Sequence, residues 1–143
     1  MPDPYYPLEG SRPLGLKDDG RPYRVLLVDD SVFILKQLQQ IFASEGFEVA
    51  ATACNGREGL EKLKELYPAI DLITLDITMP DMDGITCLEQ ILAFDKKLKV
   101  IMVSAVGKEE QVKKALLLGA KNFILKPLDR KKVIERLMIA LKK

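Results

Sequence analysis

The chain has 143 residues, of which 48% are hydrophobic and 30% charged, and its formal net charge is +1. This length and composition predict one globular domain with a proper hydrophobic core, and the near-neutral charge provides no field that would recruit nucleic acid or an anionic membrane. The sequence contains only two cysteines, Cys54 and Cys87, and no histidine. We therefore expect no disulfide framework and no zinc site, while a Ser-His-Asp triad, an imidazole base and a phosphohistidine on this chain are excluded.

The N-terminal part of the sequence differs in composition from the rest. Residues 1–22 contain five of the eight prolines and three glycines, and they show no hydrophobic period. We expect an irregular, Pro/Gly-rich extension over 1–22, followed by a folded domain over 23–143. Tyr5, Tyr6 and Leu8 could still dock on that domain or on a partner. The start of the chain lacks the basic and apolar regions of a signal peptide, and no apolar run approaches a membrane span, so we expect a cytoplasmic protein without a membrane partner.

From Arg24 onward, short apolar runs alternate with helical patterns. The runs are rich in Val, Ile and Leu and predict buried strands, at 24–28, 47–52, 70–75, 98–103 and 122–125. Apolar residues at three- and four-residue steps predict a helix after each strand. The five helices are expected from Ile34 to Gly46, from Asn55 or Gly56, after Gly84, over 108–118, and after Pro127. The basic stretch 130–132 is interpreted as a solvated helix face rather than a nucleic-acid patch.

This alternation predicts an α/β domain with a five-stranded parallel sheet covered by helices on both faces. We expect the doubly wound strand order 2-1-3-4-5, in which the first and third strands are neighbours. Asp29 and Asp30 directly follow the first run, Asp76 follows the third, and Lys126 follows the fifth. Open α/β sheets bind ligands at the carboxyl edge, where these four charged side chains would meet.

Three carboxylates at one edge would repel one another unless a hard cation lay among them, and Mg²⁺ prefers such an oxygen-rich, partly open site. A lysine beside them could neutralise an incoming phosphoryl group. Each residue also has a simpler interpretation taken alone. Asp29 and Asp30 could cap the first helix, Asp76 could form a turn, and Lys126 could lie on the surface. The combination of all four favours a site that holds a divalent metal and a phosphoryl group.

Other phosphate chemistries fit the sequence less well. Neither a G-x-x-x-x-G-K-[ST] loop nor a G-x-G-x-x-G loop follows the first strand. The run Asp76-Ile77-Thr78 is similar to the start of an aspartyl-phosphatase motif, but it lacks the second acid at the +2 position. An aspartyl-phosphate hydrolase therefore remains a minor alternative. Ser104 ends the fourth run and could either cap a strand or donate a hydroxyl hydrogen bond to a phosphoryl oxygen.

Five motifs in order carry a family resemblance: Asp29-Asp30, the run Asp-Ile-Thr-Met-Pro-Asp-Met-Asp-Gly at 76–84, Ser104-Ala105, the Phe-Ile-Leu run at 123–125, and Lys126-Pro127. Over residues 24–142 the chain resembles the receiver domains of two-component response regulators, in particular the chemotaxis-type, CheY-like members. The resemblance implies the flavodoxin-like fold of that family.

The resemblance also implies a role for each residue of the charged edge. Asp76 would be the phosphoacceptor. Asp30 and Asp76 would ligate Mg²⁺ directly together with the backbone carbonyl of Thr78, whereas Asp29 would act through water. Lys126 would bind a phosphoryl oxygen, and the bond that joins it to the following proline would be cis.

Two further residues would form the switch in this family. Ser104 would reposition to hydrogen-bond the phosphoryl group, and Phe123 would turn inward behind it. Both depart from a common family pattern, because many relatives have threonine at the position of Ser104 and many chemotaxis members have tyrosine at that of Phe123. The hydroxyl at 104 is kept, but the ring at 123 carries no hydroxyl that could report the state.

The resemblance implies a response regulator that accepts a phosphoryl group from a partner histidine kinase and that catalyses only its own Mg²⁺-dependent phosphorylation and dephosphorylation. Because the sequence stops after the fifth helix, we expect output by protein binding, with control of the flagellar motor switch as the favoured role. A phosphorelay intermediate or a phosphate sink is the alternative. We expect a monomer, a possible phosphatase partner and no nucleic-acid partner.

Overall fold

The computed structural model describes residues 12–142, and within them five strands alternate with five helices. The strands are β1 Arg24–Val28, β2 Glu48–Ala53, β3 Leu72–Asp76, β4 Lys99–Ser104 and β5 Asn122–Leu125. The helices are α1 Val32–Ser44, α2 Gly56–Leu66, α3 Gly84–Phe94, α4 Glu109–Leu118 and α5 Arg130–Lys142. Each strand begins and ends within two residues of its predicted position, so the element pattern is confirmed.

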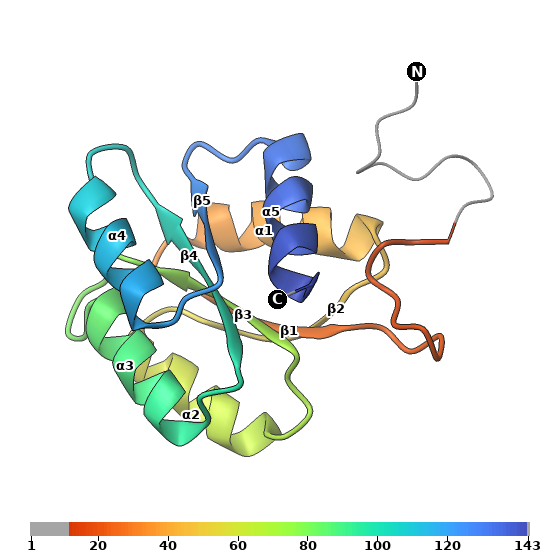
Figure 1. Cartoon of the computed structure of the whole chain (residues 1–143), viewed down its shortest axis with the longest axis horizontal. Coiled ribbons are helices and arrows are strands. Elements are labelled where there is room, and N and C mark those ends of the chain that lie inside the picture. The colour runs from red at the N-terminus through yellow and green to blue at the C-terminus, as the bar shows by residue number, and fades with distance from the viewer. Residues whose placement is uncertain (1–11, 143) are drawn as a thin grey trace.

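The strands form one parallel sheet in the order β2-β1-β3-β4-β5, which confirms the predicted doubly wound topology (Figure 1). Its register aligns the carboxyl ends of the inner strands. Val28 pairs with Leu75, and Asp76 pairs with Val103. The loops that follow β1, β3, β4 and β5 therefore emerge at one edge of the sheet.

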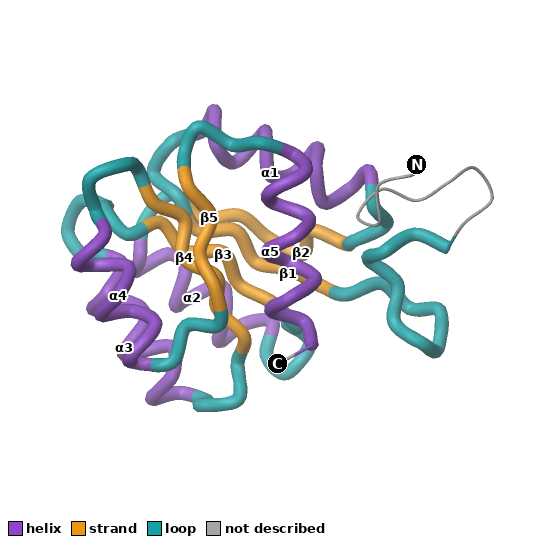
Figure 2. The backbone as a smooth tube through the Cα atoms, turned by 45° about the horizontal axis from the view of Figure 1, so that its top comes forward, coloured by secondary structure: helices purple, strands orange, loops and turns teal. Residues whose placement is uncertain are grey.

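Helices cover both faces of the sheet, with α1 and α5 on one side and α2 and α3 on the other (Figures 1 and 2). Successive residues of a strand face opposite layers, because side chains alternate along a strand. In β1, for example, Val25 and Leu27 pack in the cluster with α1 and α5, whereas Leu26 and Val28 pack in the other cluster. This two-sided burial explains why the strands are continuous apolar runs rather than alternating ones.

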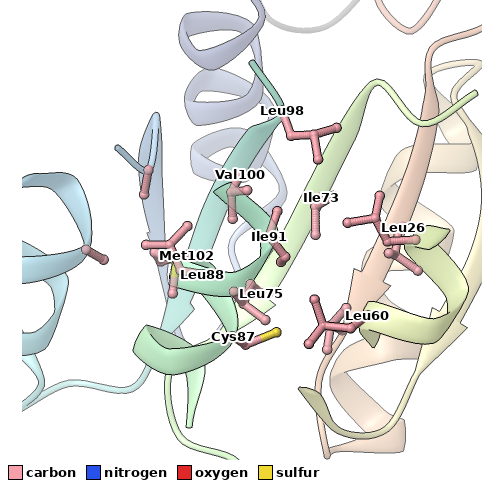
Figure 3. Packing of buried hydrophobic residues seen from close by; sticks show 14 of the residues in the cluster. Leu26, Leu60, Ile73, Leu75, Cys87, Leu88, Ile91, Leu98, Val100 and Met102 are labelled. Atoms are coloured by element: carbon pink, nitrogen blue, oxygen red, sulfur yellow. The ribbon is translucent and has the colours of Figure 1, made fainter. Parts of the chain in front are cut away.

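Figure 3 shows the layer beneath α2 and α3. Side chains of these two helices point toward the sheet and meet strand residues from β1, β3 and β4. The labelled residues are Leu60, Cys87, Leu88 and Ile91 on the helices, Leu26, Ile73, Leu75, Val100 and Met102 on the strands, and Leu98 directly before β4. The packed layer holds the inner strands at a fixed register and so fixes the edge where the charged residues lie.

The described part of the N-terminal segment, residues 12–22, contains no helix and only an isolated bridge between Leu16 and Pro22. Leu14 nevertheless packs against the core cluster beneath α1 and α5. Tyr5, Tyr6 and Leu8, which could dock on the domain, lie outside the described residues. Among the helices of residues 12–142, none has the length and apolar character needed to cross a membrane.

Candidate acidic site at the sheet edge

The backbone brings the predicted charged residues to the same edge. Asp29 and Asp30 follow β1 directly, Asp76 is the last residue of β3, and Ser104 is the last residue of β4. The amide nitrogen of Lys126, just after β5, donates to the carbonyl oxygen of Ser104 at 2.8 Å. The convergence predicted from the strand order is therefore present in the structure.

The three aspartates form one compact cluster. Each offers a carboxylate oxygen, and these oxygens lie within 4.8 Å of one another. Asp29 and Asp76 are buried, with exposed fractions of 1% and 3%, whereas Asp30 is exposed. The helix cap proposed as the simpler role for the acidic pair is provided by Ser31, whose hydroxyl oxygen accepts from the amide nitrogen of Ile34. The cluster is thus closed at its base and open to solvent on one side.

Lys126 reaches into this cluster rather than lying on the surface. Its Nζ is 3.2 Å from Oδ2 of Asp29 and 3.4 Å from Oδ1 of Asp76. Both distances exceed the range of about 2.7–2.9 Å for a tight charge-assisted hydrogen bond, so the ammonium is shared between the two carboxylates. The peptide bond between Lys126 and Pro127 is cis, as the resemblance implied. A second cis bond, between Tyr67 and Pro68, was not predicted.

The positive charge of Lys126 does not balance the negative charge of the cluster. Burial raises the pKa of Asp76 to about 7, and the neighbouring charge of Asp29 adds to the effect while Lys126 opposes it. Burial also raises the pKa of Asp29, against the lowering effects of its hydrogen bond from the Ser31 amide and of Lys126. A single lysine therefore does not compensate for two buried carboxylates beside a third one.

The same cluster fits a hard divalent cation. Apart from its ion pair with Lys126, Oδ2 of Asp29 makes no hydrogen bond to any residue that the structure describes, although it is buried. Three carboxylates that share an opening to solvent match the few protein ligands and several waters that Mg²⁺ prefers. The residues present thus fit this metal, and Asp29, Asp30 and Asp76 could hold it.

The loop after β3 supports Asp76. The amide nitrogen of Thr78 lies 3.4 Å from Oδ1 of Asp76, while the metal-binding role of the Thr78 carbonyl stays a prediction. Sequence reasoning gave Gly84 no role beyond preceding a helix. A Cβ atom at Gly84 would lie 2.3 Å from the carbonyl oxygen of Asp76 and 2.6 Å from the Cα of Ile77. Only glycine fits there without displacing the aspartate, and its place directly after the acidic loop was the available signal.

The two predicted switch residues, Ser104 and Phe123, border a cavity next to α4. Ser104 is buried, and its hydroxyl donates to the carbonyl oxygen of Ala105 at 2.9 Å. Phe123 is half-buried, with its ring 4.6 Å from the guanidinium carbon of Arg136. Both line a largely apolar cavity of about 330 Å³, which is bounded on the α4 side by residues such as Val112. Ser104 therefore lies between the acidic edge and this cavity.

A doubly wound parallel sheet with three aspartates and a lysine at its carboxyl edge defines the class of receiver domains, which are signalling proteins rather than metabolic enzymes. The model of the response regulator receiver domain family matches residues 25–138, and the chain belongs to this family. Within it, the chain is a CheY-like response regulator of the chemotaxis type.

The chemotaxis protein CheY of Treponema pallidum is 65% identical over 130 residues, which cover 91% of this chain and 90% of that protein. This alignment is longer than the stretch from Tyr23 to the C-terminus, so it includes part of the N-terminal segment. CheY of Thermotoga maritima is 46% identical over 114 residues, 80% of this chain and 93% of its own.

Among solved structures, the CheX-CheY-BeF3-Mg complex from Borrelia burgdorferi contains a similar chain. The TM-score is 0.86 at 60% identity, with 90% of this chain and 96% of that chain covered. The recognition of the family, the fold and the chemotaxis response regulator from sequence motifs is confirmed.

Proposed function

We propose that this response regulator accepts a phosphoryl group from a histidine kinase onto Asp76 and then signals by binding another protein, in control of the flagellar motor switch. The observation that supports this assignment is the position of Asp76, a buried carboxylate that ends β3 beside Lys126, Asp29 and Asp30. Asp29 also contacts the lysine and directly follows β1, but Asp76 is itself the last residue of a strand and is the phosphoacceptor that the family resemblance implies.

The transfer is an in-line displacement at phosphorus. A carboxylate oxygen of Asp76 forms the new O–P bond as the N–P bond of a phosphohistidine breaks, and the imidazole leaves with the bonding electron pair. Lys126, at 3.4 Å from the Asp76 carboxylate, neutralises a phosphoryl oxygen. Asp30, Asp76 and the Thr78 carbonyl would hold Mg²⁺ directly and Asp29 would do so through water; when bound, the metal would supply further positive charge for the equatorial oxygens. The donor histidine belongs to another chain, because this sequence contains none.

The phosphoryl group then changes the surroundings of Ser104. Its hydroxyl, which donates to the Ala105 carbonyl in this structure, gains a charged acceptor and turns toward the phosphoryl oxygens. Phe123 moves into the cavity that it borders together with Ser104. The surface of α4, β5 and α5 thus takes a second arrangement, which a partner can distinguish.

The expected partners are a kinase, a component of the motor switch and a phosphatase. The CheY of the Borrelia burgdorferi structure is in complex with CheX, and we propose a CheX-type partner for this chain as well. The aspartyl phosphate also hydrolyses spontaneously, so the signal is temporary. We further propose that the protein acts as a monomer in the cytoplasm and does not bind nucleic acid.

A binding experiment on the activated protein tests the output. The chain would be loaded with Mg²⁺ and beryllium fluoride, a phosphoryl mimic, and offered a motor-switch peptide and a histidine phosphotransfer domain in parallel. We expect the loaded form to retain the motor-switch peptide and the unloaded form to release it. Selective retention of the phosphotransfer domain would instead favour a phosphorelay intermediate, and steady turnover of a small phosphoester would favour a hydrolase.

The metal assignment predicts unequal effects of the two neighbouring aspartates. Asp30→Ala should weaken Mg²⁺ binding by roughly tenfold, and Asp29→Ala by less, because Asp30 is exposed at the open side whereas Asp29 already contacts Lys126. A titration of Mg²⁺ followed by NMR chemical shifts measures both affinities. The reverse order of the two variants would contradict this division of roles.

The switch assignment predicts that Ser104→Ala separates phosphorylation from output. The variant keeps Asp76 and Lys126, so it should still be labelled by acetyl phosphate. It loses a hydrogen bond that exists only in the phosphorylated state, so the gain in partner affinity should fall by on the order of 1–3 kcal/mol. Calorimetric titration of the partner into phosphorylated protein measures that gain. Equal gains in variant and wild type would mean that phosphorylation and partner binding are not coupled through Ser104. The control is Ser104→Thr, which keeps the hydroxyl.

A further inference from the structure

The N-terminal segment is joined to the domain by backbone hydrogen bonds, although its composition predicts an irregular extension. Residues 13–23, here called the strap, run past the start of the sheet to β1. The amide of Gly15 donates to the carbonyl of Glu45 at 2.7 Å, and the amide of Tyr23 donates to the carbonyl of Gly15 at 2.8 Å. The carbonyl of Tyr23 in turn accepts from the amide of Glu48 at 2.9 Å. The strap is therefore bonded to the end of α1 and to the start of β2.

Side-chain packing also fixes the strap. Gly15 is buried, and a Cβ atom there would lie 2.4 Å from the amide nitrogen of Phe47. Lys17 makes a 3.1 Å ion pair with Asp71, directly before β3. By contrast, Gly20 lies at the turn of the strap with φ of 89°, and no heavy atom lies within 4 Å of its Cβ position. The strap thus has one tightly packed glycine and one glycine in open space.

Glu45 connects the strap to another part of the molecule. Its side chain is buried, and a buried carboxylate is costly unless it is paired. Oε2 lies 2.7 Å from Nη2 of Arg130, while Oε1 accepts from the amide of Leu14 at 3.5 Å. Arg130 also donates to the hydroxyl of Ser44. The strap therefore covers the carboxylate that holds this arginine.

Arg130 is the first residue of α5 and lies four positions after Lys126. The contacts thus run without a break from the strap through Glu45 to the helix that follows the loop of the site lysine. The family model begins at residue 25, after the strap. The strap therefore lies outside the residues that the family model matches, whereas the alignment with the Treponema pallidum relative extends into it.

We infer that the strap is a positioning element: it keeps water from Glu45, so that the Glu45–Arg130 pair holds the first turn of α5 and the adjoining Lys126 loop in place. The effect on phosphorylation rests on the proposed function, whereas the effect on α5 does not. A strap that only added stability would change all parts of the fold alike. A positioning strap changes α5 selectively.

Matched substitutions in the full chain test the inference. Gly15→Asn puts a side chain against the Phe47 backbone, whereas Gly20→Asn puts the same side chain into open space at a positive φ that asparagine tolerates. Native-state hydrogen exchange would be followed at the first turn of α5, where the Val133 amide donates to Asp129, with amides of α3 as an internal reference. We expect Gly15→Asn to accelerate exchange in α5 by about tenfold relative to α3, and Gly20→Asn to leave the ratio unchanged.

Glu45→Gln and the double variant with Gly15→Asn complete the test. If both substitutions act through the same ion pair, the double variant should exchange in α5 no faster than the faster single variant. Equal acceleration of α3 and α5, or faster exchange confined to the strap, would overturn the inference. Labelling by acetyl phosphate should slow severalfold in Gly15→Asn. If wild type is not labelled at all, the proposed function fails, while the exchange ratios still decide the role of the strap.

Discussion

Replacing Asp76 with asparagine should abolish labelling of the protein by acetyl phosphate. The amide has nearly the shape of the carboxylate but is not a nucleophile, so no O–P bond can form at this position. The other two aspartates are poor substitutes. In Asp29 the Ser31 amide contacts Oδ1 and Lys126 contacts Oδ2, whereas in Asp76 the Thr78 amide and Lys126 both contact Oδ1. Asp30 lies at the solvent side. Intact-protein mass spectrometry after incubation with acetyl phosphate and Mg²⁺ measures the result.

Asp83→Asn provides the matched control. Asp83 lies in the same loop after β3 and caps α3 through the amide of Thr86, a role that asparagine fills equally well. Its label should equal that of wild type. Stoichiometric labelling of Asp76→Asn at another residue would contradict the phosphoacceptor assignment, and circular dichroism of the variant would establish that the fold is retained.

The substitution Asp76→Asn should also stabilise the metal-free protein at alkaline pH. Burial raises the pKa of Asp76 to about 7, so the folded state keeps this carboxyl protonated at pH values where the unfolded chain has released the proton. The stability due to this difference is fully present below the unfolded pKa, near the ordinary aspartate value of 3.8, and is lost as pH rises to the folded pKa. Asparagine resembles the protonated form at every pH.

Wild type and Asp76→Asn should therefore have similar stability near pH 4, while the variant should be more stable at pH 8 by on the order of 2–4 kcal/mol, at about 1.4 kcal/mol per pKa unit. Urea denaturation in EDTA at both pH values measures the gap. Asp18→Asn, at an exposed position, should show none. A gap that is constant with pH would mean that the substitution acts through packing rather than through charge. Added Mg²⁺ should reduce the gap, because it stabilises only the carboxylate form.

Much of the architecture could be predicted from the sequence, because burial on both faces leaves a distinctive pattern. In β1 the residues from Val25 to Val28 are all apolar, and the charged residue that follows them, Asp29, marks the carboxyl end of the strand. The five motifs then specified which charged residues meet. Placement at the edge needed only strand order, so Asp76 and Lys126 were found without knowledge of any side-chain contact.

The contacts that could not be predicted depend on pairs far apart in sequence. Glu45 continues the pattern of the α1 helix, and Arg130 lies in the basic stretch interpreted as a solvated face. That interpretation was wrong for Arg130, because it pairs with the buried Glu45 carboxylate. Gly15 lies in a proline-rich segment without period, and its burial follows from its contact with Phe47. No local pattern reports such distant pairs.

At the sheet edge the carboxylates outnumber the cations. A proton, a metal ion and a phosphoryl group therefore influence one another's binding there. Fully ionised, the three aspartates and Lys126 carry two more negative than positive charges, which one divalent ion would balance. A proton on Asp76 and a metal beside it relieve the same repulsion, so acid should drive the metal out. An attached phosphoryl group brings back negative charge and should hold the metal more tightly. By thermodynamic reciprocity the metal must then favour the acyl phosphate by the same factor. Under the proposed function, the concentration of free Mg²⁺ should therefore set the fraction of the protein that a kinase can phosphorylate.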